Sequence, residues 1–127
     1  SCGGPREAFG QRIERWLRAR ARDALSADTA ECARRAVVTV RSVSIGDAGT
    51  RWGSCSSSGS IRYNWRLVLA PLDVRRWVVA HEVAHRVHMN HGPKFKALES
   101  ALFDGDADAA RLLLRRIGPG LKRIGRI

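Results

Sequence analysis

The sequence predicts an α+β domain in which an N-terminal helix is followed by a small three-stranded sheet and then by further helices. Residues 6–25 repeat apolar side chains at helical spacing, residues 37–69 are rich in β-branched and alternating side chains, and residues 74–117 return to helical spacing between prolines and glycines. With 127 residues, the chain is long enough for one such domain and too short for two independent ones.

The first helix is expected over residues 6–25. Arginines occupy the sides of this helix that its apolar residues leave free, which suits a solvated surface better than a basic arm for nucleic acid. Asp28 either caps a second helix over residues 29–35 or lies in a continuation of the first, and the pattern leaves both open. The side chains expected to form the apolar face are Phe9, Ile13, Trp16, Leu17 and Leu25.

The three strands are expected in the next thirty or so residues. Residues 37–45 are β-branched and form the first, and residues 50–55 and 60–69 form a hairpin across a serine- and glycine-rich turn. In the last strand, apolar and polar side chains alternate, so one face should be core and the other solvent or a cleft. The apolar set is Ile61, Tyr63, Trp65 and Leu67, and the polar set is Arg62, Asn64 and Arg66.

Three helices are expected after the sheet. The first runs from Val74 to about Met89, with Pro71 and Asp73 at its start, and Gly92 and Pro93 end it. The second carries an apolar stripe, and the third covers residues 107–117. Residues 1–5 and 121–127 are expected to be peripheral parts of the same domain. The expected core residues are Phe95, Leu98 and Leu102 in the second helix and Leu112, Leu113 and Ile117 in the third.

Charge and cysteine content indicate what kind of partner and which cellular compartment to expect. Lys and Arg number 23 against 12 Asp and Glu, a net charge of +11 that favours an anionic partner such as nucleic acid. The arginines are spread over the whole chain, however, and a compositional bias explains them more simply. Cys2, Cys32 and Cys55 lack the spacing of a disulfide framework or a cysteine zinc site, and no apolar run reaches the ~20 residues of a membrane span. A reducing, cytoplasmic location without membrane contact is expected.

All four histidines lie in one short segment, where His81, Glu82 and His85 form an HExxH motif. Helical residues four apart share a face at about 5–6 Å, so the two imidazoles can bind one metal ion with Glu82 beside them. Zinc lowers the pKa of a bound water toward about 7, which would let Glu82 act as the general base. The alternative is two core histidines at this spacing by chance, which is rare in a chain with so few histidines.

A hydrolytic zinc site takes a third protein ligand. His88 would share the face of His85 if the helix continued, whereas His91 requires the chain to turn first. Asn90 and the Gly92 and Pro93 pair favour such a turn, so His91 is the expected ligand and His88 the alternative. The spacing also matches the metzincin pattern HExxHxxGxxH, but His88 replaces the turning glycine, so the turn is expected later, around Asn90.

Several motifs together resemble the YgjP-like metal-dependent hydrolases, which are compact zincins similar to the SprT and WLM metallopeptidase groups. The resemblance is dense from Thr50 to about Phe95 and implies a zincin-like core, metallopeptidase activity and His91 as third ligand. Members usually carry more chain on the N-terminal side, so this sequence is expected to be the catalytic core. The motifs are RWGSC at residues 51–55, NWRL at 64–67, HEVAH at 81–85, and His91 with Phe95.

The RWGSC segment supplies the candidate substrate residues. In zincins a strand near the metal runs beside the substrate, so Gly53 would let a substrate backbone approach closely. Arg51, Ser54 and Asn64 can stabilise an oxyanion or hold a substrate carboxylate or phosphate. Equally, Arg51 and Asn64 can bond the backbone of neighbouring loops.

The leading hypothesis is a metallopeptidase that holds one Zn²⁺ and cleaves peptide or protein substrates, although nickel, cobalt or iron suits the same ligands. A hydrolase of an anionic non-peptide substrate, such as a nucleotide phosphoester, is the alternative and would use Arg51, Arg62 and Arg66. A protease associated with nucleic acid is a further alternative that uses the net charge.

Overall fold

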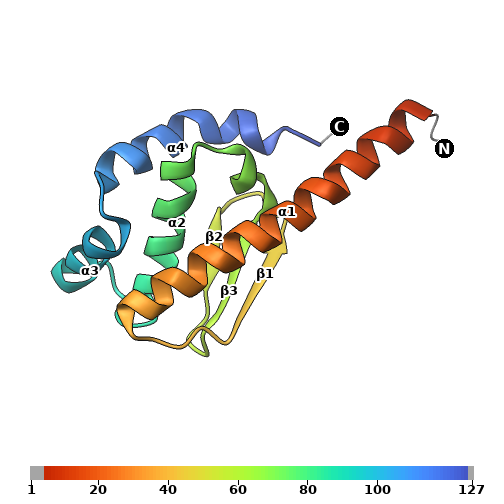
Figure 1. Ribbon diagram of the computed structural model, residues 1–127. Coiled ribbons are helices and arrows are strands. Elements are labelled where there is room, and N and C mark those ends of the chain that lie inside the picture. The colour runs from red at the N-terminus through yellow and green to blue at the C-terminus, as the bar shows by residue number, and fades with distance from the viewer. Residues whose placement is uncertain (1–4, 126–127) are drawn as a thin grey trace.

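The computed structural model describes residues 5–125 and shows the α+β order expected from the sequence (Figure 1). Cys2 and the outermost residues of both expected peripheral segments lie outside that range. The elements are α1 (Pro5–Ala36), β1 (Ser42–Gly46), β2 (Gly53–Cys55), β3 (Ser60–Asn64), the 3₁₀ helix η1 (Trp65–Leu69), α2 (Leu72–Ala84), α3 (Pro93–Phe103) and α4 (Ala107–Lys122).

Helix α1 is continuous through Asp28, which settles the choice that the sequence left open. It ends at Val37, whose φ of 57° is unusual for a β-branched residue. The amide of Val38 donates to the carbonyl of Ala33 at 3.0 Å, and that of Val37 donates to Arg34 at 3.2 Å, which is the pattern of a Schellman cap. Because this cap uses residues 37 and 38, the first strand begins at Ser42, and the prediction of a strand from residue 37 was wrong.

The apolar face predicted for the first helix was wrong in its N-terminal half. Phe9, Ile13 and Trp16 are 57%, 42% and 60% exposed. Core contact begins at Leu17, which packs half-buried against the core, and Ala21 and Leu25 are fully buried. At 100° per residue, the three exposed residues point about 130° away from the two buried ones. The first turns of α1 extend beyond the rest of the molecule (Figure 1). Their large apolar side chains are exposed.

The sheet has the order β1-β3-β2, with β1 parallel and β2 antiparallel to β3. Ile61 and Tyr63 of β3 are buried on the face that α1 and α2 cover, and the Tyr63 hydroxyl lies 2.8 Å from that of Thr29 on α1. On the other face, Ser54 of β2 stands opposite exposed Arg62. The expected hairpin and the inward alternation of β3 are both confirmed.

The last strand ends at Asn64, earlier than expected, because the Asn64 side chain accepts a hydrogen bond from the amide of Arg66 and starts η1. Asn64 and Arg66 were expected on an open face, but they are only 2% and 1% exposed. The Arg66 guanidinium pairs with Asp47 and donates to the carbonyl of Ile124. The side chains of Asn64 and Arg66, which the alternation pattern predicted to face solvent or a cleft, are thus covered by polar partners from distant loops.

The C-terminal helices differ from expectation mainly at their ends. Helix α4 continues past Ile117 to Lys122, and Gly118 lies flat against Trp52, where a Cβ would be 3.2 Å from the indole ring. Lys122 donates to the carbonyls of Gly49 and Arg51 before β2. The buried stripe of α4 is Ala110, Leu114 and Gly118, whereas Leu112, expected in the core, is 53% exposed; Phe95 and Leu102 of α3 are buried as predicted.

Across residues 5–125, none of the helices combines the length and the apolar character needed to pass through a bilayer.

Candidate metal centre

His81 and His85 come from the C-terminal end of α2. This helix is buried on several sides, including Val74, Val78 and Val83, so its position is fixed by the core. The imidazole centroids are 5.0 Å apart and the rings are nearly perpendicular. The expected pairing of residues four apart on one helical face is therefore present.

His91 reaches the same place because α2 stops early. The helix ends at Ala84 rather than near Met89, and tight turns follow in which Arg86 donates to Val83 and Val87 donates to Ala84. Bends follow at Met89 and Asn90, so the chain changes direction around Asn90, as predicted. The regular α-helix that would have favoured His88 ends before that residue.

The three imidazoles of His81, His85 and His91 form a cluster in which one potential ligand atom from each lies within 4.8 Å of the others. Among the described residues this is the one group of three or more ligand-type side chains that can hold an ion. The Nε2 atoms of His85 and His91 are 3.0 Å apart. Phe95 of α3 lies against all three rings, with centroid distances between 4.7 and 5.0 Å.

Two of these imidazoles are oriented by partners at Nδ1. The Nδ1 atom of His81 lies 2.6 Å from Oε2 of Glu99, and that of His85 lies 3.1 Å from the carbonyl oxygen of His88. Metal-binding histidines usually donate their second ring N–H in this way, which fixes the tautomer and leaves Nε2 to the metal. Burial lowers the pKa of His85 and so favours its neutral, metal-binding form.

The sequence did not point to Glu99. Its only signal was an acidic side chain four residues after Phe95 on the apolar face of α3, and it is 9% exposed in the structure. His88 contributes its backbone carbonyl to the site, whereas its imidazole is outside the cluster.

Glu82 is buried beside the histidines, at 6% exposed. Burial raises the pKa of its carboxyl group to about 7, and the positive charges of His81 and Arg51 oppose this shift. The carboxylate lies against Gly53 of β2, where a Cβ would be 2.9 Å from Oε2. Gly53 therefore makes room for Glu82, a reason for glycine that the sequence alone did not suggest.

Comparison with known families agrees with this geometry. The family described as YgjP-like, metallopeptidase domain, matches residues 3–116. The chain belongs to this family. Searches among curated proteins and among solved structures each gave no match. The matched region includes all three histidines of the cluster that can hold a metal ion.

All four candidate substrate residues of this YgjP-like domain border one cavity of about 270 Å³, whose lining includes no histidine. Arg51 is exposed, and its charge acts on Glu82. Ser54 is half-buried and lies on the sheet face opposite Gly53. The Asn64 amide donates to the carbonyl of Ala48 at 3.0 Å while its oxygen accepts from Arg66, so its side chain braces the loop before β2.

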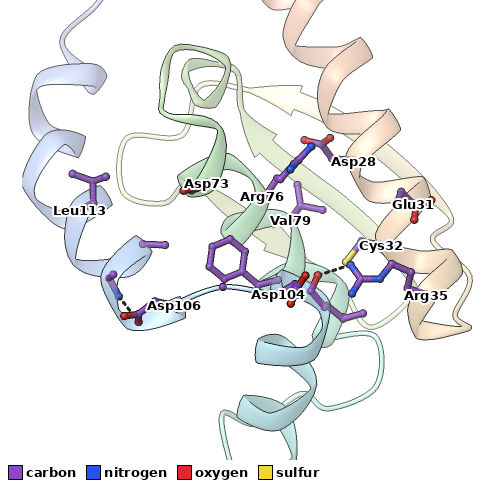
Figure 2. A pocket seen from close by; sticks show the side chains of 15 residues that line it. Asp28, Glu31, Cys32, Arg35, Asp73, Arg76, Val79, Asp104, Asp106 and Leu113 are labelled. Atoms are coloured by element: carbon purple, nitrogen blue, oxygen red, sulfur yellow. Dashed lines mark hydrogen bonds between the residues drawn. The ribbon is translucent and has the colours of Figure 1, made fainter.

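A larger cavity, of about 510 Å³, lies between α1, α2 and the turn that joins α3 to α4 (Figure 2). It is lined by no histidine and by neither Glu82 nor Glu99. This larger hollow is therefore separate from the candidate metal centre of the YgjP-like domain.

Proposed function

We propose that this YgjP-like domain is a compact zincin that cleaves peptide bonds, with His81, His85 and His91 as ligands of one zinc ion. The observation that carries the proposal is the convergence of three imidazoles, two of which are already oriented through Nδ1. Three imidazole nitrogens suit a catalytic zinc ion, because such an ion takes three protein ligands and keeps a fourth position open. Other divalent transition metals fit the same three nitrogens, and zinc is preferred on ligand type.

Glu82 is proposed as the general base. A bound zinc ion would supply Lewis-acid activation of water and of the scissile carbonyl. The Glu82 carboxylate accepts a proton from the attacking water and returns it to the leaving amine nitrogen as the peptide bond breaks. A pKa near 7 suits both transfers at neutral pH, because the group is neither a very weak base nor a very weak acid there.

The substrate is proposed to lie along β2. This strand pairs with β3 on one side only among the described strands, so its other edge can accept an extended peptide. Gly53 of the same strand touches Glu82, which would bring such a peptide close to the base. Arg51 and Ser54 are proposed to contact the substrate, and Asn64 to hold the loop that presents them.

The structure gives less support than the sequence did to the alternative of an anionic non-peptide substrate. It relied on three arginines, and Arg66 is buried and paired with Asp47. Arg51 and Arg62 remain beside the 270 Å³ cavity. A link to nucleic acid rests on the net charge of +11 alone.

Metal analysis with matched histidine variants tests the ligand set. The purified protein should hold close to one zinc per chain, and His81→Ala, His85→Ala and His91→Ala should each lose it. His88→Ala is the control, because its backbone carbonyl remains and its ring lies outside the cluster. Folded protein that binds no metal would reject the proposal, and zinc lost from His88→Ala but kept by His91→Ala would reject the ligand assignment.

Parallel assays test the reaction. Glu82→Gln should retain zinc but lose hydrolysis of a denatured protein substrate by about 10²- to 10⁴-fold, the usual contribution of a general base. Nucleotide phosphoesters assayed beside it separate the two substrate classes. Zinc-loaded protein that cleaves only the phosphoesters would establish the alternative.

A further inference from the structure

The protruding half of α1 carries an apolar stripe that nothing in the described structure covers. Phe9, Ile13 and Trp16 are exposed, and their spacing of i, i+4 and i+7 is the spacing by which helices anchor in grooves. Arg20 stacks on Trp16, with its guanidinium carbon 5.6 Å from the ring centroid. We call this surface, together with Arg6 and Arg12, the arm face.

The arm face is basic as well as apolar. At 100° per residue, Arg6, Arg12 and Arg20 all lie within about 60° of Phe9 around the helix axis. The two acidic residues of the same turns, Glu7 and Glu14, lie about 140–160° from Phe9, and Glu14 is paired there with Arg18. A partner that covers the arm face should therefore offer an apolar groove with acidic edges.

The 510 Å³ cavity has this character (Figure 2). Five carboxylates and two guanidinium groups line it, a balance of −3 on a chain whose net charge is +11. Three of the carboxylates have partners, because Asp28 pairs with Arg75, Glu31 pairs with Arg34, and Asp106 accepts a hydrogen bond from the amide of Ala109. Asp73 and Asp104 form no ion pair within residues 5–125. The apolar part of the lining includes Val79, Leu102, Phe103 and Leu113.

Both surfaces lie on α1, and their positions are symmetric. The apolar stripe of the arm face spans residues 9–16, and the α1 wall of the cavity spans residues 28–35, so residue 22 lies midway between them. Of the four α1 residues in that wall, Glu31, Arg35 and Asp28 lie about 40°, 80° and 100° from Phe9 around the axis, and buried Cys32 lies about 140° from it. Each arm face lies about 28 Å along the helix from the cavity of its own chain. Two α1 helices that pack antiparallel about residue 22 would therefore place each arm face over the cavity of the other copy.

We propose that two copies of this chain associate through antiparallel α1 helices, with the arm face of each seated on the acidic cavity of the other. The contact is isologous, so one two-fold axis makes both halves of the interface at once. Burial of Phe9, Ile13 and Trp16 drives the association, and arginines opposite carboxylates set the orientation. A stripe of three residues is narrow for a membrane surface, and Ile13 between two aromatic residues does not stack on nucleobases.

Analytical ultracentrifugation of the 127-residue chain tests the association. A particle of twice the 14.0 kDa chain mass is expected at micromolar concentration. Phe9→Ala with Trp16→Ala should raise the dissociation constant at least tenfold while circular dichroism keeps the helical signal, because neither side chain belongs to the core. Arg15→Ala, on the opposite side of the same turns, is the matched control and should leave it unchanged. A monomer at 100 μM, or a dimer indifferent to the double variant, would overturn the proposal.

Charge reversal and cross-linking test which surfaces meet. Arg12→Glu with Arg20→Glu should weaken the dimer, as should Glu31→Lys with Asp73→Lys, and the four changes in one chain should restore it. A photo-reactive amino acid at position 9 should cross-link to residues 28–35 or 102–113 of the other copy. Cross-links confined to the other arm, or a fourfold variant no tighter than either pair, would show that the cavity is not the partner surface.

Discussion

Two buried charged side chains, Arg66 in η1 and Glu82 beside the histidines, have opposite surroundings. Around η1, Arg66 is 1% exposed and bonds both Asp47 and Ile124, while Asn64 uses both ends of its amide. At the histidine end, Glu82 is 6% exposed, and no ion pair or hydrogen bond engages its carboxylate within residues 5–125. The partners of Arg66 stabilise the fold. Burial without such partners makes the ionised form of Glu82 unfavourable and raises its pKa, which suits a catalytic base.

The largest expected effect is at Arg66, the buried charge that has partners. Asp47→Ala leaves the guanidinium of Arg66 buried with a carbonyl and the Trp65 ring as partners, and unpairing a buried charge costs about 3 kcal/mol or more. For a chain of this size the melting temperature should fall by about 10 °C. Asp108→Ala, which removes an exposed partner of Arg111, is the control and should change stability by less than about 0.5 kcal/mol. Equal effects from the two variants would abolish the distinction between the two surroundings.

In the metal-free protein, removal of the Glu82 charge should raise stability, whereas Asp47→Ala lowers it. Its pKa is about 7 in the folded state against an ordinary 4.5, so between these values the folded state binds more protons than the unfolded state. Stability therefore falls as pH rises through that window. Glu82→Gln removes this penalty and should stabilise the metal-free protein by roughly 3 kcal/mol above pH 8, with little difference near pH 4.

Urea unfolding in the presence of a chelator, at pH 4.5 and pH 8, measures this difference. The gap between Glu82→Gln and the parent protein should open only at the higher pH. A gap of the same size at both pH values would mean that packing, and not the buried charge, is responsible.

The sequence predicted what depends on local geometry. His81, Glu82 and His85 lie on one helical turn, and the order of helices and strands follows from patterns within a few residues of each other. The end of α2 was predicted too late, near Met89 and not at Ala84, whereas the bend at Met89 and Asn90 that precedes His91 was predicted correctly.

What the sequence missed depends on partners far along the chain. Glu99 meets His81 across two helices, and Asp47 meets Arg66 across the sheet. The spacing of Phe9 and Trp16 correctly indicated a helix but not its buried side, because the side of α1 that meets the core is the one that carries Ala21 and Leu25. Hydrophobic periodicity indicates which side of a helix is apolar but does not indicate what that side packs against.

Glu99→Gln tests whether the histidine end depends on orientation by a partner. The amide cannot accept the His81 N–H with the strength of a carboxylate, and loss of such a partner costs about 10- to 100-fold in metal affinity. Competition with a zinc-binding dye measures this, while thermal stability of the metal-free protein should change little. Ser100→Ala, an exposed neighbour on α3, should keep the parent affinity. An unchanged affinity in Glu99→Gln would mean that the packing of Phe95 orients the rings instead.

The smallest change with a specific expectation is Gly53→Ala. The added methyl would be 2.9 Å from Oε2 of Glu82, so the carboxylate must shift, and because it is the end of a flexible side chain the stability cost should stay below about 1 kcal/mol. A general base displaced by a few tenths of an ångström should lower kcat about tenfold, with KM and zinc content unchanged. Gly10→Ala, where the methyl meets nothing within 4 Å, is the control. If the effect acts through Glu82, Gly53→Ala should cost nothing further in a Glu82→Gln background, since two changes in one contact are not additive; a full tenfold loss there would instead place Gly53 against the substrate.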